Sequence, residues 1–162
     1  MSLIALTNAF LPLLKKSQGR IVNISSICGL LGITFRTSYA ASKFAVTGFS
    51  KALRAELHPH NVSVSVIYPG YICTNISKNA QNGSGKQLGV TDSNIANGIP
   101  VDIAVANMFK VIHMRQSCYV IYNNWTQWRN VTFAPISSIF EDWAMLSDFK
   151  GQVKALANAK KD

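Results

Sequence analysis

The chain has 162 residues, of which 48% are apolar and 14% are charged, a length and balance that predict one compact globular unit and not two. Its formal net charge is +9, but the Lys and Arg residues are scattered, with no run longer than two. Basic and aromatic residues do not alternate as in chains that stack nucleic-acid bases, so we expect no nucleic-acid partner. A solvated basic surface is the favoured interpretation, with contact to acidic lipid or a phosphorylated substrate as the alternatives.

The three cysteines, Cys28, Cys73 and Cys118, lack metal-ligand spacing, so we expect no metal site. They are predicted to be reduced, buried thiols facing a cytosol-like compartment. The first fourteen residues lack the charged start and small-residue cleavage site of a secretory signal. We also expect no membrane span, because 131–140, the longest weakly charged stretch, has about half of the roughly 20 residues that one needs. A cytoplasmic location follows for the chain as printed.

Helices and strands are predicted to alternate along the chain. Apolar spacing and turn residues indicate a helix over 1–17, a strand over 20–25, a helix from 38 to just before Pro59, a strand over 62–68, a helix after Pro100 and a strand over 118–122. The 62–68 run, VSVSVIY, alternates in polarity like a strand and stops at Pro69-Gly70. Strand, helix and strand of these lengths form a right-handed βαβ unit.

Two segments leave alternatives open. Residues 77–98 are rich in Asn, Ser, Gly and Gln, and a loop of this length is either a functional lid or disordered. The tail over 123–162 holds all three tryptophans. We favour a helical packing segment there, and the alternative is an interfacial element that touches lipid or lines an apolar substrate pocket.

Three polar side chains carry the chemistry. Tyr39 and Lys43 lie four residues apart on a predicted helix, so they share one face. The Lys43 ammonium favours phenolate over phenol, so the tyrosine can pass a proton at ordinary pH. Ser26 leaves the end of a strand, where ligands bind in open α/β sheets, and its hydroxyl can hydrogen-bond a substrate carbonyl oxygen.

The stretches GRIVNISSICGLLG, TSYAASKFAVTGFSKALRAEL and VSVSVIYPGYICTNIS resemble the short-chain dehydrogenase/reductase family in its classical form. The resemblance implies an α/β fold, here a partial Rossmann-like doubly wound parallel sheet of about three strands with flanking helices. It also implies Ser26, Tyr39 and Lys43 as catalytic residues, with Ser26 on the substrate. The implied cofactor is NAD or NADP, held by Tyr39, Lys43, Pro69, Gly70, Ile72 and Thr74.

The resemblance further implies boundaries and relatives. Residues 1–122 correspond to the C-terminal half of a Rossmann-type domain, and 123–162 to a substrate-side extension and tail. The segments PGYICTNISKNA and KQLGVTDSNIANG resemble the dehydrogenase/reductase member 7B type, which is related to the 11β-hydroxysteroid dehydrogenase-like enzymes. Such relatives are often anchored to the endoplasmic reticulum or a related membrane by an N-terminal segment. The implied substrate is a lipid-like or steroid-like carbonyl or alcohol.

In the family, a glycine-rich turn that binds phosphate precedes the helix that corresponds to residues 1–17. The printed residues therefore do not include it. We therefore expect the chain, made alone, to be inactive or nearly so, since the dinucleotide pyrophosphate binds at that turn. The alternative is a non-catalytic short isoform that pairs with full-length partners. The first two helices could still offer a surface for homo-oligomers.

Overall fold

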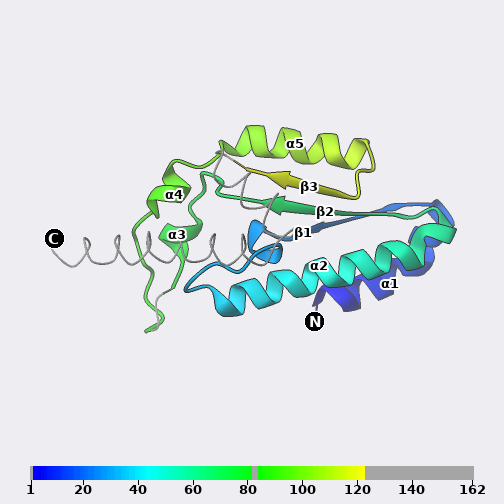
Figure 1. Cartoon of the computed structure of the whole chain (residues 1–162), viewed down its shortest axis with the longest axis horizontal. Coiled ribbons are helices and arrows are strands. Elements are labelled where there is room, and N and C mark those ends of the chain that lie inside the picture. Colours follow the sequence, from blue (N-terminus) through cyan, green and yellow to red (C-terminus); the bar gives the residue numbers. More distant parts are fainter. Residues whose placement is uncertain (1, 82–83, 123–162) are drawn as a thin grey trace, which may run out of the picture.

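Three parallel strands form one sheet between two layers of helices (Figure 1). The computed structural model describes residues 2–81 and 84–122. The strands are β1 (Arg20–Ile24), β2 (Ser63–Pro69) and β3 (Cys118–Ile121), and β2 lies between the other two. The predicted α/β class with a doubly wound parallel sheet is confirmed, and the predicted tail lies outside the described residues.

The three long helices lie where the sequence predicts them. They are α1 (Ser2–Ser17), α2 (Thr37–Leu57) and α5 (Val101–His113). Four short elements were not predicted: two 3-10 turns, η1 (Ile27–Gly29) and η2 (His58–His60), and two one-turn helices, α3 (Ile76–Asn79) and α4 (Ser93–Ala96). Each is three or four residues long, too short for a hydrophobic period to reveal.

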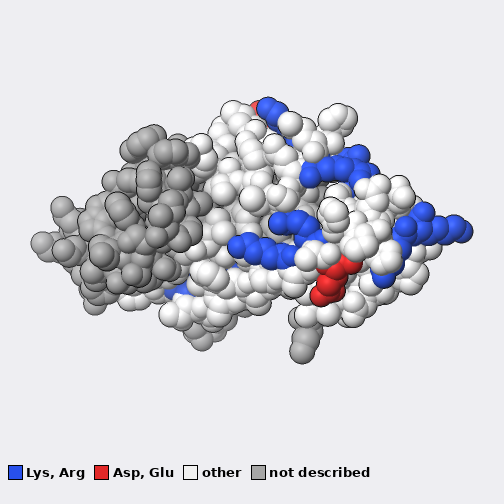
Figure 2. Space-filling model, turned by 45° about the vertical axis from the view of Figure 1, so that its right-hand side comes forward, with Lys and Arg blue, Asp and Glu red and all other residues white. Residues whose placement is uncertain are grey.

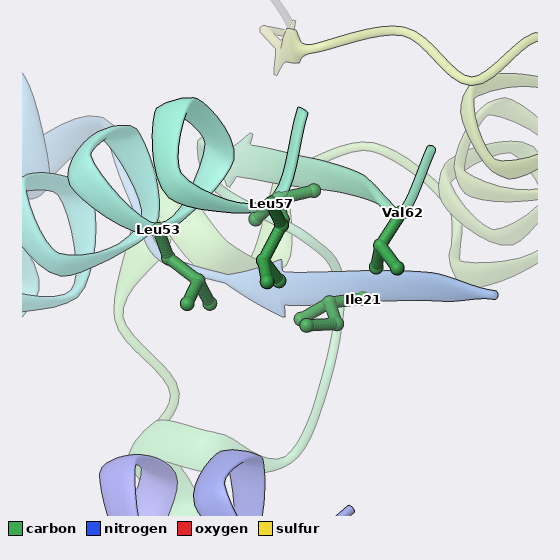
Figure 3. Packing of buried hydrophobic residues seen from close by; sticks show 5 residues of the cluster. Ile21, Leu53, Leu57 and Val62 are labelled. Atoms are coloured by element: carbon green, nitrogen blue, oxygen red, sulfur yellow. The ribbon is translucent and has the colours of Figure 1, made fainter. Parts of the chain in front are cut away.

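One face of the sheet is covered by α2 and α1. Ile21 of β1 packs with Leu53 and Leu57 of α2 and with Val62, which precedes β2 (Figure 3). Apolar side chains of α1 and α2, Leu11, Leu14 and Phe49, pack against this cluster. The apolar stripes predicted for the first two helices therefore meet the same face of the sheet.

The opposite face is covered by α5. Ile67 of β2, Val111 of α5 and Ile121 of β3 form its buried centre. As a result β2 is buried on both faces along its middle five residues, and the alternation of VSVSVIY does not mark a solvent-facing side. Its inner serine, Ser65, satisfies its hydroxyl by donating to the Gln116 carbonyl at 2.6 Å.

All three strands run in the same direction, so their carboxyl ends meet at one edge of the sheet. At that edge the chain leaves β1 into η1, and it leaves β2 toward α3 and α4. The 77–98 segment, expected to be a lid or disordered, is folded over its described residues. It contains α4 and an antiparallel bridge between Gln81 and Gln87.

On the face shown in Figure 2, the basic residues do not gather in one patch. Figure 2 shows Lys and Arg in several separate groups on the face in view, with few Asp or Glu among them. Among residues 2–81 and 84–122, no helix is long and apolar enough to cross a bilayer. The prediction of three buried thiols is wrong for two of them: Cys28 is buried in η1, whereas Cys73 and Cys118 are exposed because they lie at a loop and at the start of the short strand β3.

Candidate active site

A cavity of about 650 Å³ opens at the carboxyl edge of the sheet. Its walls come from the ends of β1 and β2, from η1, from the first turns of α2, and from the segment between α3 and α4. All of the residues that the sequence singled out lie on it: Ser26, Tyr39, Lys43, Pro69, Gly70, Ile72 and Thr74. A parallel sheet gathers residues that are far apart in sequence at this edge, which is where open α/β sheets bind ligands.

Ser26 is held at the point where β1 turns into η1. Its backbone is extended, and its Oγ accepts a hydrogen bond from the Cys28 amide at 3.2 Å, so it caps the 3-10 turn. The same hydroxyl donates to the Pro69 carbonyl at 3.4 Å, a long and therefore weak bond. The side chain is oriented by its neighbours, and its proton can still move to a stronger acceptor in the cavity.

Tyr39 and Lys43 lie one turn apart on the first half of α2. The Lys43 Nζ is 5.6 Å from the centroid of the Tyr39 ring, so the ammonium faces the aromatic system. It also donates to the Ile24 carbonyl at 3.3 Å, which ties α2 to the end of β1. Tyr39 is 43% exposed, so its ring is open to a ligand that enters the cavity.

The turn after β2 offers backbone groups to the cavity. Ile99 donates to the Tyr71 carbonyl and accepts from the Cys73 amide, each at 2.9 Å, in a parallel bridge between Ile72 and Ile99. In such a bridge the amide of Ile72 points away from Ile99. Gly98 permits this close approach, because a Cβ there would lie 2.8 Å from the Tyr71 carbonyl oxygen.

The wall opposite α2 was not predicted residue by residue. Ile76 at the start of α3, Leu88 and Val90 after it, and Ile95 in α4 add apolar side chains to the cavity. The last three lie within the predicted 77–98 lid, where they are the large apolar residues of a polar stretch. Arg36 and Asp92, 3.8 Å apart as an ion pair, also line the cavity and join the start of α2 to the N-terminus of α4.

Tyr68, a buried residue of β2 next to Pro69 of the cavity wall, has a shifted pKa. Burial raises the pKa of Tyr68 above its ordinary value of 10.0, while a hydrogen bond with the Thr47 side chain opposes that shift. Tyr68 is therefore a neutral phenol at ordinary pH. No group of three His, Cys, Asp or Glu that could hold a metal occurs in the described part of the chain.

Sequence comparisons identify proteins that are similar to this chain. The family model described as short chain dehydrogenase matches residues 1–85. Over 103 residues the chain is 47% identical to dehydrogenase/reductase SDR family member 7B of Xenopus tropicalis, covering 62% of this chain and 33% of that protein. The protein of the same name from Bos taurus is 48% identical over 103 residues, with coverages of 62% and 32%. The match thus spans about a third of the length of these relatives.

Solved structures show the same fold. A short chain dehydrogenase from Burkholderia cenocepacia in complex with NADP superposes with a TM-score of 0.64 at 25% identity, covering 82% of this chain and 49% of that one. A short-chain dehydrogenase from Streptomyces avermitilis gives a TM-score of 0.63 at 22% identity, with coverages of 88% and 56%. Since the family model spans more than half of the chain, and the parallel sheet agrees with it, the chain belongs to the short-chain dehydrogenase family.

Proposed function

We propose that these residues form the catalytic part of an NAD(P)-dependent oxidoreductase that reduces a carbonyl or oxidises the corresponding alcohol. The observation that carries the proposal is the convergence of Ser26, Tyr39 and Lys43 on one cavity at the carboxyl edge of the sheet. A hydroxyl, a phenol and an ammonium are the groups needed to bind a carbonyl oxygen, protonate it and favour that proton transfer.

Each residue has a distinct role in this scheme. Ser26, freed from its weak bond to the Pro69 carbonyl, donates to the substrate oxygen. Tyr39 gives that oxygen its proton, and the neighbouring Lys43 ammonium stabilises the negative charge that the phenol oxygen then acquires. In the oxidation direction the same groups act in reverse.

The cavity also fits a nicotinamide. The cofactor, when bound, supplies or accepts the hydride. Lys43 and Tyr39 would hold its ribose, while Ile72 and Thr74, after the Pro69-Gly70 turn, would hold its carboxamide. The Ile72 amide, directed away from Ile99, supports this assignment because it is a donor on the free side of the bridge.

The substrate is proposed to be lipid-like or steroid-like. The apolar side chains of Ile76, Leu88, Val90 and Ile95 line the same cavity as the polar groups of Ser26 and Tyr39. A substrate with an apolar body and a single carbonyl matches this combination. Residues 1–122 would then be the C-terminal half of the Rossmann-type domain, with 123–162 extending it.

We further propose that the 162-residue chain, tested alone, binds whole dinucleotides poorly. The printed sequence contains no glycine-rich turn to hold the pyrophosphate, so only contacts to the nicotinamide and its ribose are available. Titration with NADPH and NADH, followed by fluorescence, should show no micromolar binding; micromolar affinity for either would overturn this part of the proposal.

The site itself is tested with reduced nicotinamide mononucleotide, which carries the nicotinamide and ribose without the pyrophosphate bridge. Added at millimolar concentration, it should shift the amide NMR signals of Ile72 and Thr74. Lys43→Met should remove those shifts, whereas Lys51→Met, a surface change on the same helix, should leave them in place. Shifts confined to other parts of the chain, or equal in both variants, would reject the assignment.

A second function, pairing with a full-length partner without catalysis, is favoured by one observation. Helix α1 leaves Leu6, Phe10 and Leu13 more than half exposed, and within the described residues β1 pairs only with β2. An apolar helix face beside an open strand edge invites association. Transcript sequence upstream of Met1 separates the two functions: an in-frame glycine-rich turn supports the enzyme, and a stop codon followed by an authentic start favours the pairing protein.

A further inference from the structure

A buried row of polar side chains lies directly beneath the candidate active site. Ile21 and Asn23 of β1 and Ser25, the residue after it, face α2, and the row changes from apolar to polar toward the carboxyl end of the strand. Ser25 and Ser26 both line the cavity, and they are 3% and 8% exposed. Their hydroxyls have different partners: the Ser25 Oγ contacts Lys43 and Thr47 of α2, whereas the Ser26 Oγ contacts the Cys28 amide and the Pro69 carbonyl.

Ser25 ties the catalytic helix to the strand. Its Oγ donates to the Lys43 carbonyl at 3.0 Å, and the Ile24 carbonyl accepts from the Lys43 ammonium at 3.3 Å. Lys43 is thus held at its backbone and at its side-chain end by two consecutive residues of the chain. Translation or rotation of the first half of α2 would break both bonds.

Thr47 ties the same helix to η1. Its Oγ1 lies 3.1 Å from the carbonyl oxygens of Gly29 and Lys43 and 3.3 Å from the Ser25 hydroxyl. Gly29 closes this group, because a Cβ there would lie 2.4 Å from the Ser25 Oγ and 2.7 Å from the Lys43 carbonyl oxygen. The turn that carries Ser26 can therefore sit on α2 only with glycine at position 29.

The protons of this group can be assigned by counting donors. Each hydroxyl has one proton, so Ser25 donates to the Lys43 carbonyl and Thr47 donates to the Gly29 carbonyl. In this arrangement each hydroxyl proton is used once, and the two carbonyls each accept a hydrogen bond.

We propose that Ser25 and Thr47 are positioning residues, which fix Ser26 on η1 and Lys43 on α2 in a common geometry through buried hydroxyl contacts. The inference rests on the proposed function, because it assigns a purpose to the distance between those two catalytic groups. Thr47 does not line the cavity, and Ser25, which does, acts through its hydrogen bond to the Lys43 carbonyl. Their effect reaches the cavity through backbone carbonyls, and a buried hydroxyl that loses its partner weakens such an arrangement strongly.

The thiol of Cys28 can serve as a probe of this geometry. Cys28 lies in η1, is 5% exposed, and is joined to Ser26 through its amide, whereas Cys73 and Cys118 are exposed. The rate of iodoacetamide labelling at Cys28, read by peptide mass spectrometry on the whole chain, reports how firmly η1 is held. The two exposed thiols serve as internal references, and the measurement requires no catalytic activity.

Thr47→Val should raise Cys28 labelling about five- to thirtyfold and leave the reference thiols unchanged, because it removes the hydroxyl without changing the volume. Thr47→Ser should restore a rate near that of the parent. The matched control is Thr7→Val, which alters a buried threonine on α1. Urea unfolding of each variant corrects the labelling rates for global opening.

Unchanged labelling in Thr47→Val, an equal rise in Thr7→Val, or failure of Thr47→Ser to restore the rate would overturn the proposal. If Thr47→Val shows no cooperative unfolding, Ser25→Ala is measured in the same way, with the same expected rise. Turnover is the second readout: a preparation that reduces a carbonyl should lose kcat in Thr47→Val and regain it in Thr47→Ser. Lack of turnover is the result expected of the 162-residue chain alone, and the thiol rates would then decide the positioning role, while the nicotinamide mononucleotide titration tests the proposed function.

Discussion

The two walls of the cavity are built differently. The wall formed by β1, η1 and α2 is crossed by hydrogen bonds from Ser25, Thr47 and Lys43, of which the Thr47 bond is buried and the Ser25 bond partly buried. The wall formed by the segment after α3 presents Leu88 and Val90, which are at least half exposed, and its charged contact is the Arg36–Asp92 pair. Under the proposed function the difference is a division of labour: groups that need fixed positions lie on the bonded wall, and the apolar wall would select the substrate.

Gly29→Ala should produce the largest loss and is the most direct test of the bonded wall. The new methyl group would overlap the Ser25 hydroxyl and the Lys43 carbonyl, and we expect a loss of about 3 kcal/mol in the free energy of unfolding. Urea unfolding measures it. Gly48→Ala is the matched control on α2, where nothing lies within 4 Å, and it should stabilise the chain by about 0.5–1 kcal/mol. Equal effects of the two changes would contradict close packing at Gly29.

Ser50→Ala tests the next contact along the same wall. The Asn23 amide donates to the Ser50 hydroxyl at 2.8 Å, and Ser50 is fully buried, so the change leaves a buried donor without its acceptor. We expect a loss of about 2 kcal/mol in the free energy of unfolding. Ser42→Ala, an exposed serine on the same helix, should stay within about 0.5 kcal/mol of the parent. If both variants unfold alike, the bonded wall does not depend on its buried contacts.

Asp92→Ala tests the apolar wall, where a smaller and local effect is expected. The Asp92 carboxylate caps α4 by accepting from the Asn94 amide at 2.8 Å, and it pairs with Arg36. Hydrogen exchange should show α4 destabilised by about 1 kcal/mol, with the amides of β2 unaffected. Asp92→Asn keeps the capping oxygen and loses only the partly exposed ion pair, so its effect should be smaller. Matching losses at β2 would show that the two walls are not independent.

Of these changes, Tyr68→Phe should alter the free energy of unfolding least at neutral pH. Its effect should appear at alkaline pH. The pKa of Tyr68 is raised by burial, so between 10.0 and its folded value the unfolded chain releases this proton while the folded chain keeps it. The contribution is complete below pH 10 and is lost as pH rises toward the folded pKa. The free energy of unfolding, measured in urea from pH 8 to 11, should therefore fall less steeply in Tyr68→Phe than in the parent. Parallel curves would contradict burial of a neutral phenol.

Sequence reasoning located the site but not its support. The spacing of Tyr39 and Lys43 and the strand-end position of Ser26 predicted that these three residues lie at the carboxyl edge, because helix period and parallel topology are local rules. Thr47 and Gly29 gave no comparable signal, since a threonine within a helix and a glycine in a loop are common. Their meaning depends on contacts between segments that lie 18 residues apart in the chain.

The strand VSVSVIY illustrates the same limit. Its alternation predicted a strand correctly, yet its serine Ser65 is as buried as its valines, because β2 lies between two strands and under helices on both faces. Likewise, the polar 77–98 segment gave equal support to a lid and to disorder. Its placement against the cavity depends on residues such as Ile95, which become buried only when the sheet is assembled.

Residue types and short spacings were enough to predict the order of strands and helices, the chemical identity of the candidate catalytic groups and the family. Which partner each hydroxyl finds depends instead on the assembled fold: Ser25 bonds to Lys43 of α2, and its neighbour Ser26 bonds to Pro69 at the end of β2. The contribution of a hydrogen bond to stability depends mainly on its burial and on its partner. Both are set by how β1, η1 and α2 pack together.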